Sequence, residues 1–180
     1  MVEKKEIEGI AIIETDVFND ERGYFMEFYN EKKFKHNVKS IFSFKQDNIS
    51  CSKKYVLRGL HLQSPPFDQG KLIQVLKGKV LDVVVDVRKK SKTFGKHLKI
   101  ELSSNNNKKL WVPTGFAHGF LSLEDDTILS YKCTNYYSKD HELDLLWNDE
   151  NLNIDWGIEN PIISEKDKMA TKFENFNSPF

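Results

Sequence analysis

One histidine stands in an unusual place in the sequence. The stretch VLRGLHLQ, residues 56–63, has the pattern of a half-buried β-strand, and His61 lies in it between Leu60 and Leu62. On a strand, the side chain of His61 points to the opposite face from the two leucines. An imidazole that lines a cavity is a candidate general base, whereas one bonded to a neighbouring group is a structural histidine. The residues alone leave both interpretations open.

Arg58 precedes His61 by three positions, so strict alternation places the two side chains on opposite faces. They reach one cavity only if Gly59 marks a bulge or a bend, as glycines inside strands often do. Arg58 and Arg22 are then candidates for a diphosphate clamp, because guanidinium groups match phosphate oxygens. Either arginine alone would more simply form a surface ion pair.

Two further polar side chains are expected to point inward. Tyr131 shares a face with Leu129 and Cys133 in ILSYKCT, which makes it either a hydrogen-bonded core tyrosine or a candidate general acid. Lys71 shares a face with Ile73 and Val75 in GKLIQV. An inward lysine requires an anionic partner or a depressed pKa, so Lys71 is a candidate cation for a developing negative charge.

A metal centre is not favoured by the spacing of the histidines. His118 in VPTGFAHGF lies among glycines, which predicts a tight corner at a barrel mouth. His61 and His118 are candidate ligands, but HLQ lacks a paired HxH and no acid has ligand spacing. The chain also contains no phosphate loop, zinc signature, nucleophile elbow or dinucleotide fingerprint.

The elements that position these residues are mostly short strands separated by polar or glycine-bearing turns. The predicted strands are IEGIAIIET, GYFMEFYN, FSFKQDNIS, YVLRGLHLQ, GKLIQVLKG, KVLDVVVDVR, KHLKIELS, KKLWVPTG, HGFLSLED and TILSYKCTNYY. Residues 30–38 predict a short helix with Asn30 as its N-cap. After Tyr137 the pattern becomes irregular, and ISEKDKMA predicts a second short helix with Ser164 as N-cap and Asp167 three positions later. We predict one all-β domain over residues 1–180, an antiparallel sandwich or barrel.

Composition excludes several classes of protein. The 27 basic and 27 acidic side chains cancel, so no overall field attracts nucleic acid or a membrane surface. The charged start has no apolar secretory segment, and the longest apolar run is interrupted by Asp82 and Asp86. Two cysteines without metal-type spacing, Cys51 and Cys133, indicate reduced thiols and a cytoplasmic protein.

Eight sequence blocks then occur in order between Ile10 and Lys172. They are RGxF, QDNxS, VLRGLHxQ, QGKLxxVxxGxVxDVxVDxR, SxTFGK, LWxPxGFAHGF, YKCTxYY, and IDW followed by SEKD. Together they resemble the dTDP-4-dehydrorhamnose 3,5-epimerase family of nucleotide-sugar epimerases. The resemblance implies a cupin-type jelly-roll barrel with a few short helices, mainly N-terminal and C-terminal. It also implies no metal, no cofactor, and a homodimer in which the N-terminal strand pairs with the partner's sheet.

The resemblance further implies a mechanism. His61 matches the family's base, Asp167 the carboxylate that orients its imidazole, and Tyr131 the acid on the far face of the sugar. Lys71 matches the cation beside the enolate oxygen. The implied binding residues are Arg22, Glu27, Gln46, Asn48, Arg58, Gln63, His118, Tyr137, Glu142 and Lys166. Arg22 and Arg58 would hold the diphosphate, and Tyr137 would shape the sugar or base pocket.

Two departures from the family pattern concern specificity. Leu62 stands where an aromatic residue often follows the histidine, and SPPFDQ places Phe67 and Asp68 at a variable position near the site. The expected substrate is dTDP-4-dehydro-6-deoxyglucose, converted to dTDP-4-dehydrorhamnose. The alternatives are a GDP-linked 4-keto-6-deoxyheptose, inversion at one centre only, a sugar 3,4-ketoisomerase and a non-catalytic sugar-binding cupin.

Overall fold

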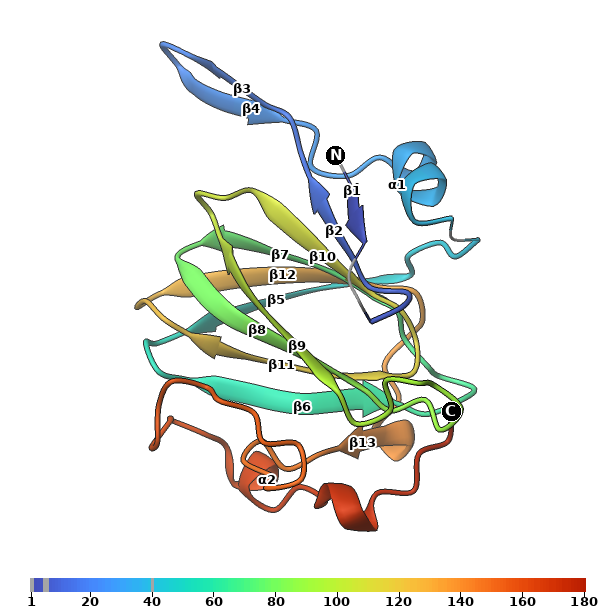
Figure 1. The fold of residues 1–180 in the computed structure, drawn as a ribbon. Helices are drawn as coiled ribbons and strands as arrows, with labels where there is room; N and C mark the ends of the chain where they lie inside the picture. The colour runs from blue at the N-terminus through green and yellow to red at the C-terminus, as the bar shows by residue number, and fades with distance from the viewer. Residues whose placement is uncertain (1, 5–6, 40) are drawn as a thin grey trace.

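Two antiparallel sheets face each other in the computed structural model, which describes residues 2–4, 7–39 and 41–180 (Figure 1). In these residues the first sheet runs, in spatial order, β1 (Val2–Lys4), β2 (Ala11–Glu14), β10 (Lys108–Val112), β7 (Lys71–Lys77), β12 (Thr127–Cys133), β5 (Gln46–Ser52). The second runs β13 (Glu142–Asp144), β6 (Leu57–Gln63), β11 (Phe116–Ser122), β8 (Lys79–Asp86), β9 (His97–Ser103). The all-β prediction is therefore confirmed, and the arrangement is a jelly roll.

The interior between the sheets is apolar along most of its length. Its buried side chains come from both sheets and include Ile12, Ile73, Val84, Leu110 and Leu129. A second apolar cluster lies outside the five-stranded sheet, where the C-terminal segment covers it (Figure 1). Leu60 and Leu62 belong to this outer cluster, together with Trp156. Because a sheet covered on both faces buries both sets of alternating side chains, β6 carries leucines outward and polar groups toward the barrel.

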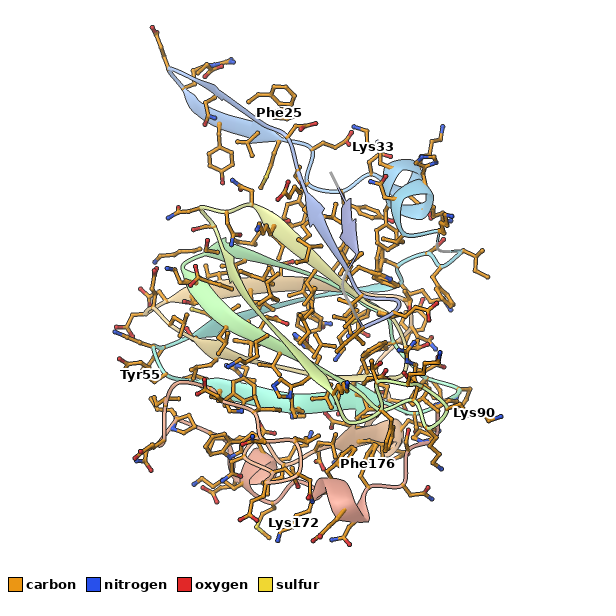
Figure 2. The ribbon with its side chains drawn as sticks, in the orientation of Figure 1. Phe25, Lys33, Tyr55, Lys90, Lys172 and Phe176 are labelled. Carbon is orange, nitrogen blue, oxygen red and sulfur yellow. The ribbon has the colours of Figure 1, made fainter. Side chains whose placement is uncertain are left out.

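A hairpin projects from the barrel at the opposite side from the C-terminal segment (Figure 1). It consists of β3 (Val17–Asp20) and β4 (Gly23–Met26), paired with each other. Its aromatic side chains are exposed, as Figure 2 shows for Phe25. The sequence predicted an aromatic strand over residues 23–30, but the strand ends at Met26, and the preceding strand β3 was not predicted. Strand β13 was missed as well, because among the described residues it pairs only with β6, which is far away in the sequence.

Short helices occupy the two regions in which they were predicted. Helix α1 (Glu31–Val38) begins after Asn30, whose side chain accepts a hydrogen bond from the backbone N–H of Lys33 (3.2 Å). Helix α2 (Glu165–Lys168) begins after Ser164, whose hydroxyl accepts from the N–H of Asp167 (3.1 Å). Two 3₁₀ turns, η1 (Lys139–His141) and η2 (Phe173–Asn175), complete the helical content of the described residues. None of the described helices is long and apolar enough to cross a membrane.

The predicted corner at His118 is wrong. His118 lies inside β11, which pairs with β8 from Phe116 to Ser122 without interruption. The turn occurs earlier, at Gly115, whose φ of +86° suits glycine. The alternating side chains of FAHGFLS continue the strand through the histidine, so His118 is a buried strand residue.

Candidate active site

The site is assembled at one end of the barrel, where β6 and β12 finish and β5 and β7 begin. We call this end the mouth. His61 lies on β6, and its Nε2 is 2.7 Å from Oδ1 of Asp167 on helix α2. The Asp167 side chain is only 4% exposed, against 29% for His61. If Nε2 donates to this carboxylate, Nδ1 is left as the basic nitrogen of the ring.

Asp167 is held in its charged form by the groups around it. Burial alone would raise its pKa, but the hydrogen bond and the charge of His61 hold the pKa below its ordinary value. The backbone N–H of Gly59 also donates to Oδ2, at 3.4 Å. A fixed carboxylate of this kind sets both the tautomer and the orientation of an imidazole.

Gly59 lies in a bulge of the kind that Arg58 and His61 need in order to reach one cavity. The pairing of β6 with β11 shifts between His118 and Phe120, so two residues of β6 face one of β11. Gly59 has φ +124°, and a Cβ placed there would lie 2.5 Å from the Cα of Gly119. The bulge reverses the alternation, which places Arg58 on the same face of β6 as His61, bonded to Ser52 Oγ (3.2 Å) at the far end of β5.

The facing sheet contributes Lys71 and Tyr131. Lys71 on β7 pairs in register with Cys133 on β12, and its Nζ donates to the backbone carbonyl of His61 (3.4 Å). Burial lowers the pKa of Lys71, and neighbouring acidic groups, including Asp82, oppose that shift. Burial raises the pKa of Tyr131, so its hydroxyl remains protonated at neutral pH and is able to donate a proton.

Asp82 is a site residue that the sequence analysis did not identify. It is fully buried on β8, and both of its oxygens lie within 3.0 Å of Nε2 of His118. Burial raises the pKa of Asp82, whereas His118 and Lys71 oppose the increase. The alternation of side chains in VLDVVVDV could have identified Asp82 as an inward residue, because Asp82 shares a face with Val80 and Val84, which are both in the interior.

Most of the predicted binding residues form a connected polar network at the mouth. Gln46 donates to Asn48 Oδ1 (3.0 Å) and accepts from the N–H of Tyr137 (2.9 Å). The Tyr137 hydroxyl donates to Glu142 (3.0 Å), and Glu142 also pairs with Lys166 (2.6 Å). Burial alone would raise the pKa of Glu142, but its bonds to Lys166 and Tyr137 lower it.

Gln63 belongs to the same end of the barrel. Its Oε1 accepts from the N–H of Ser138 at 2.9 Å, and its backbone pairs with Glu142 of β13. Gln63 therefore attaches the segment after β12 to the end of β6.

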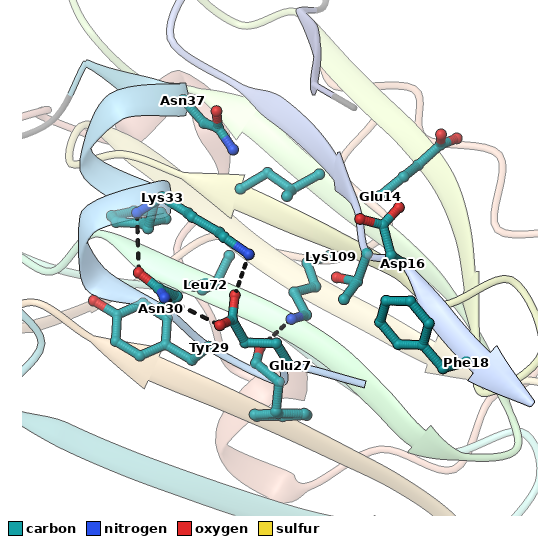
Figure 3. Close-up of a pocket in the computed structure, with 14 residues that line it drawn as sticks. Glu14, Asp16, Phe18, Glu27, Tyr29, Asn30, Lys33, Asn37, Leu72 and Lys109 are labelled. Carbon is teal, nitrogen blue, oxygen red and sulfur yellow. Dashed lines mark hydrogen bonds and ion pairs between the residues drawn. The ribbon is translucent and has the colours of Figure 1, made fainter. Parts of the chain in front are cut away.

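Two of the predicted binding residues, Arg22 and Glu27, do not lie at the mouth of this chain. Arg22 is at the tip of the β3–β4 hairpin, 89% exposed, and pairs with Asp20 (2.5 Å). Glu27 lines a different pocket, of about 260 Å³, between α1 and the outer face of the six-stranded sheet (Figure 3). There it pairs with Lys33 at 2.8 Å. Arg22 on the projecting hairpin and Glu27 next to helix α1 therefore both lie away from His61 of the same chain.

The described side chains contain no group of three or more His, Cys, Asp or Glu arranged to hold a metal ion. Both histidines of the site instead have carboxylate partners, Asp167 and Asp82. The chemistry available to these residues is proton transfer: a carboxylate-bound imidazole, a protonated phenol and the buried amine of Lys71 lie around one mouth.

A cupin-type barrel that gathers a general base, a general acid and a lysine in this way defines the class of protein as one suited to proton transfer on a bound ligand. The sequence model of the family described as dTDP-4-dehydrorhamnose 3,5-epimerase matches residues 4–175. The chain belongs to this family. The relative from Shigella flexneri is 49% identical over 170 residues, 94% of each chain, and that from Methanothermobacter thermautotrophicus is 46% identical over 168 residues, covering 92% of this chain and 90% of the relative.

Solved structures agree with this assignment. The dTDP-4-dehydrorhamnose 3,5-epimerase of Elizabethkingia anophelis has a TM-score of 0.94 at 48% identity, covering 99% of this chain and 98% of that chain. The dTDP-6-deoxy-D-glucose-3,5-epimerase of Legionella pneumophila, in complex with dTDP-4-keto-L-rhamnose, has a TM-score of 0.95 at 40% identity. That match covers 98% of this chain and 94% of the Legionella chain.

Proposed function

We propose that the chain epimerises dTDP-4-dehydro-6-deoxyglucose at C3 and C5 to give dTDP-4-dehydrorhamnose. The observation that carries the proposal is the His61–Asp167 pair, placed by the fold in one barrel with Tyr131 and Lys71. Family membership and a structural relative bound to dTDP-4-keto-L-rhamnose support this substrate over a GDP-linked heptose.

The proposed mechanism assigns each proton transfer to one of these side chains. His61 removes the proton from the carbon next to the C4 ketone, and the electron pair moves onto the ketone oxygen as an enolate. Lys71 stabilises that oxygen, and the Tyr131 hydroxyl returns a proton to the opposite face of the same carbon. Solvent then restores the protonation states of His61 and Tyr131. Positioned general acid–base catalysis contributes roughly 10²–10⁴-fold, and an oxyanion donor about 10²–10³-fold more.

In this proposal, the predicted binding residues around the site bind the nucleotide and diphosphate parts of the substrate. Arg58 pairs with the diphosphate, since its fork matches phosphate oxygens. The half-exposed ring of Tyr137 provides a stacking surface for the base or the sugar. No cofactor is required for these steps.

We also propose that the enzyme is a homodimer with exchange of the N-terminal strand. In the single chain, Val2–Lys4 pairs with Ala11–Ile13 of β2, and exchange would replace this pairing with one to the partner's sheet. The exposed rings of Phe18, Tyr24 and Phe25 support an interface on the hairpin. Such a dimer would allow the hairpin's Arg22 to serve the partner's site. Sedimentation equilibrium distinguishes a dimer from a monomer.

The free thiols of Cys51 and Cys133 support a cytoplasmic location.

Proton NMR in D₂O tests the proposed activity. With dTDP-4-dehydro-6-deoxyglucose, we expect deuterium at both C3 and C5 together with the rhamno-configured product, and activity that survives exhaustive chelation. Exchange at one carbon would indicate a single-centre enzyme, and exchange only with a GDP-linked 4-keto-6-deoxyheptose would change the substrate. Movement of the carbonyl would indicate a ketoisomerase. Binding without exchange would indicate a non-catalytic cupin. His61→Ala should abolish exchange and retain binding.

A further inference from the structure

Two segments outside the proton-transfer groups are tied together at the mouth. The first, residues 64–69, follows β6, and the second, residues 134–141, joins β12 to β13. The N–H and the hydroxyl of Ser64 donate to the carbonyl of His141 (2.8 and 3.2 Å). Gln69 donates to the carbonyl of Asn135 (2.9 Å), and Asn135 donates to that of Pro66 (2.9 Å). We call these two segments the mouth clasp.

An aromatic contact lies at the centre of the mouth clasp. The rings of Phe67 and His141 have centroids 4.6 Å apart, and both residues are half-buried. Nδ1 of His141 is also 2.8 Å from the hydroxyl of Ser138. The backbone and the ring of His141 are therefore each fixed, the first by Ser64 and the second by Phe67 and Ser138.

The second segment leads directly into the polar network of the site. It contains Tyr137, and Glu142 follows it as the first residue of β13. The hydroxyl of Tyr137 donates to Glu142, so the two side chains form one arm whose base is the mouth clasp. The backbone of Glu142 pairs with Gln63, two residues after His61 on β6, so this carboxylate lies at the end of the barrel that holds His61. Its charge opposes the lowering of the Lys71 pKa and adds to the raising of the Tyr131 pKa.

We propose that Phe67 and His141 are positioning residues that hold the Tyr137–Glu142 arm ready to receive the nucleotide-diphosphate sugar. The inference rests on the proposed function and deepens it. The ring of Phe67 contacts that of His141, and Nδ1 of His141 lies next to the hydroxyl of Ser138, so we expect removal of either ring to leave His61 and Tyr131 in place. A pre-ordered arm reduces the ordering cost at binding, and its loss therefore weakens affinity rather than the chemical step.

The test compares Phe67→Ala, His141→Ala and the double variant with a matched control. Phe94→Ala is the control, because Phe94 also packs against one ring, that of Phe173 at 5.3 Å, but lies in the 91–96 turn. We expect Phe67→Ala to raise both the KM for dTDP-4-dehydro-6-deoxyglucose and the Kd for dTDP about tenfold. The kcat should stay within about twofold, and the control should keep the wild-type KM and Kd. Phe67→Tyr, which keeps the ring, should restore affinity.

The double variant separates a joint role from two independent ones. If the rings act as a unit, the double variant binds no more weakly than either single variant. An unchanged KM in Phe67→Ala, a loss confined to kcat, or an equal rise of KM in Phe94→Ala would overturn the inference. Failure of the proposed function can be told apart from failure of this inference. If the function is wrong, the wild type shows no turnover, but the Kd values for dTDP can still be compared between the wild type and the variants. A wild-type chain that binds no dTDP overturns both.

Discussion

The imidazole of His61 and the carboxylate of Asp167 lie 2.7 Å apart, although 106 positions separate them in the chain. The pair forms because α2 packs against β6 and presents Asp167 from its first turn. The N-cap bond of Ser164 fixes the start of that helix, so a capping residue and a catalytic orientation are provided by the same turn.

Replacing the carboxylate tests this pairing. Asp167→Asn keeps the size of the side chain but removes the charge that stabilises the imidazolium. We expect kcat for epimerisation to fall by roughly 10²-fold or more, with KM little changed. Steady-state assays with dTDP-4-dehydro-6-deoxyglucose measure the effect. Asp126→Asn, at an exposed loop position, is the control. Wild-type kcat in Asp167→Asn would remove this carboxylate from the mechanism.

Removing the phenolic hydroxyl separates proton abstraction from inversion. Tyr131→Phe retains His61, so deuterium should still enter the substrate from the side of the base, while the yield of inverted product falls by roughly 10²-fold or more. Proton NMR in D₂O follows exchange and inversion in the same sample. A variant that inverts both centres at the normal rate would show that the replacement proton comes from another group.

The bulge at Gly59 is expected to tolerate no side chain. Gly59 and Gly23 have nearly the same φ, +124° and +122°, but a Cβ at Gly23 would meet nothing within 4 Å. Gly23→Ala should therefore cost about 1–2 kcal/mol of unfolding free energy from backbone strain alone. Gly59→Ala should cost at least about 2 kcal/mol more, because its Cβ collides with the backbone of β11. Urea unfolding measures both; equal losses would contradict the crowding argument.

Asp86 should make stability depend on pH in the acidic range. It is fully buried and accepts hydrogen bonds from Arg88, from Ser91 Oγ (2.6 Å) and from Thr93 Oγ1 (2.6 Å). Burial alone would raise its pKa, but these bonds lower it from 3.8 to about 2. Because the folded pKa is depressed, the stabilisation is complete above pH 3.8 and is lost as pH falls toward 2.

The corresponding variant gives the size of the effect. Asp86→Asn should reduce the free energy of unfolding by about 2 kcal/mol at pH 7, and the difference from the wild type should shrink at pH 2–3. Denaturant titrations at both pH values measure it, with exposed Asp155→Asn as the matched control. A difference that is independent of pH would show that packing, rather than ionisation, explains the loss.

Local features of the structure were readable from the sequence because neighbouring residues determine them. Alternation predicted most of the strands, and Asn30 and Ser164 were correctly predicted as N-caps. A bulge at Gly59 was the stated condition for Arg58 and His61 to share one cavity, and that bulge is present. The inward directions of Lys71 and Tyr131 followed from their apolar neighbours. The family resemblance, which rests on ordered blocks, supplied the fold name and the expected roles.

The sequence by itself therefore determined most of the strands, the faces on which Lys71 and Tyr131 lie, and the residues at which the two helices begin. Only the tertiary structure decided that Asp167 meets His61, that Asp82 meets His118, and that Arg22 and Glu27 lie away from both. It also decided that Leu60 and Leu62 face the C-terminal segment rather than the barrel interior. The physical reason is that alternation and capping act between near neighbours, whereas these contacts join segments distant in the chain through burial that involves the whole fold.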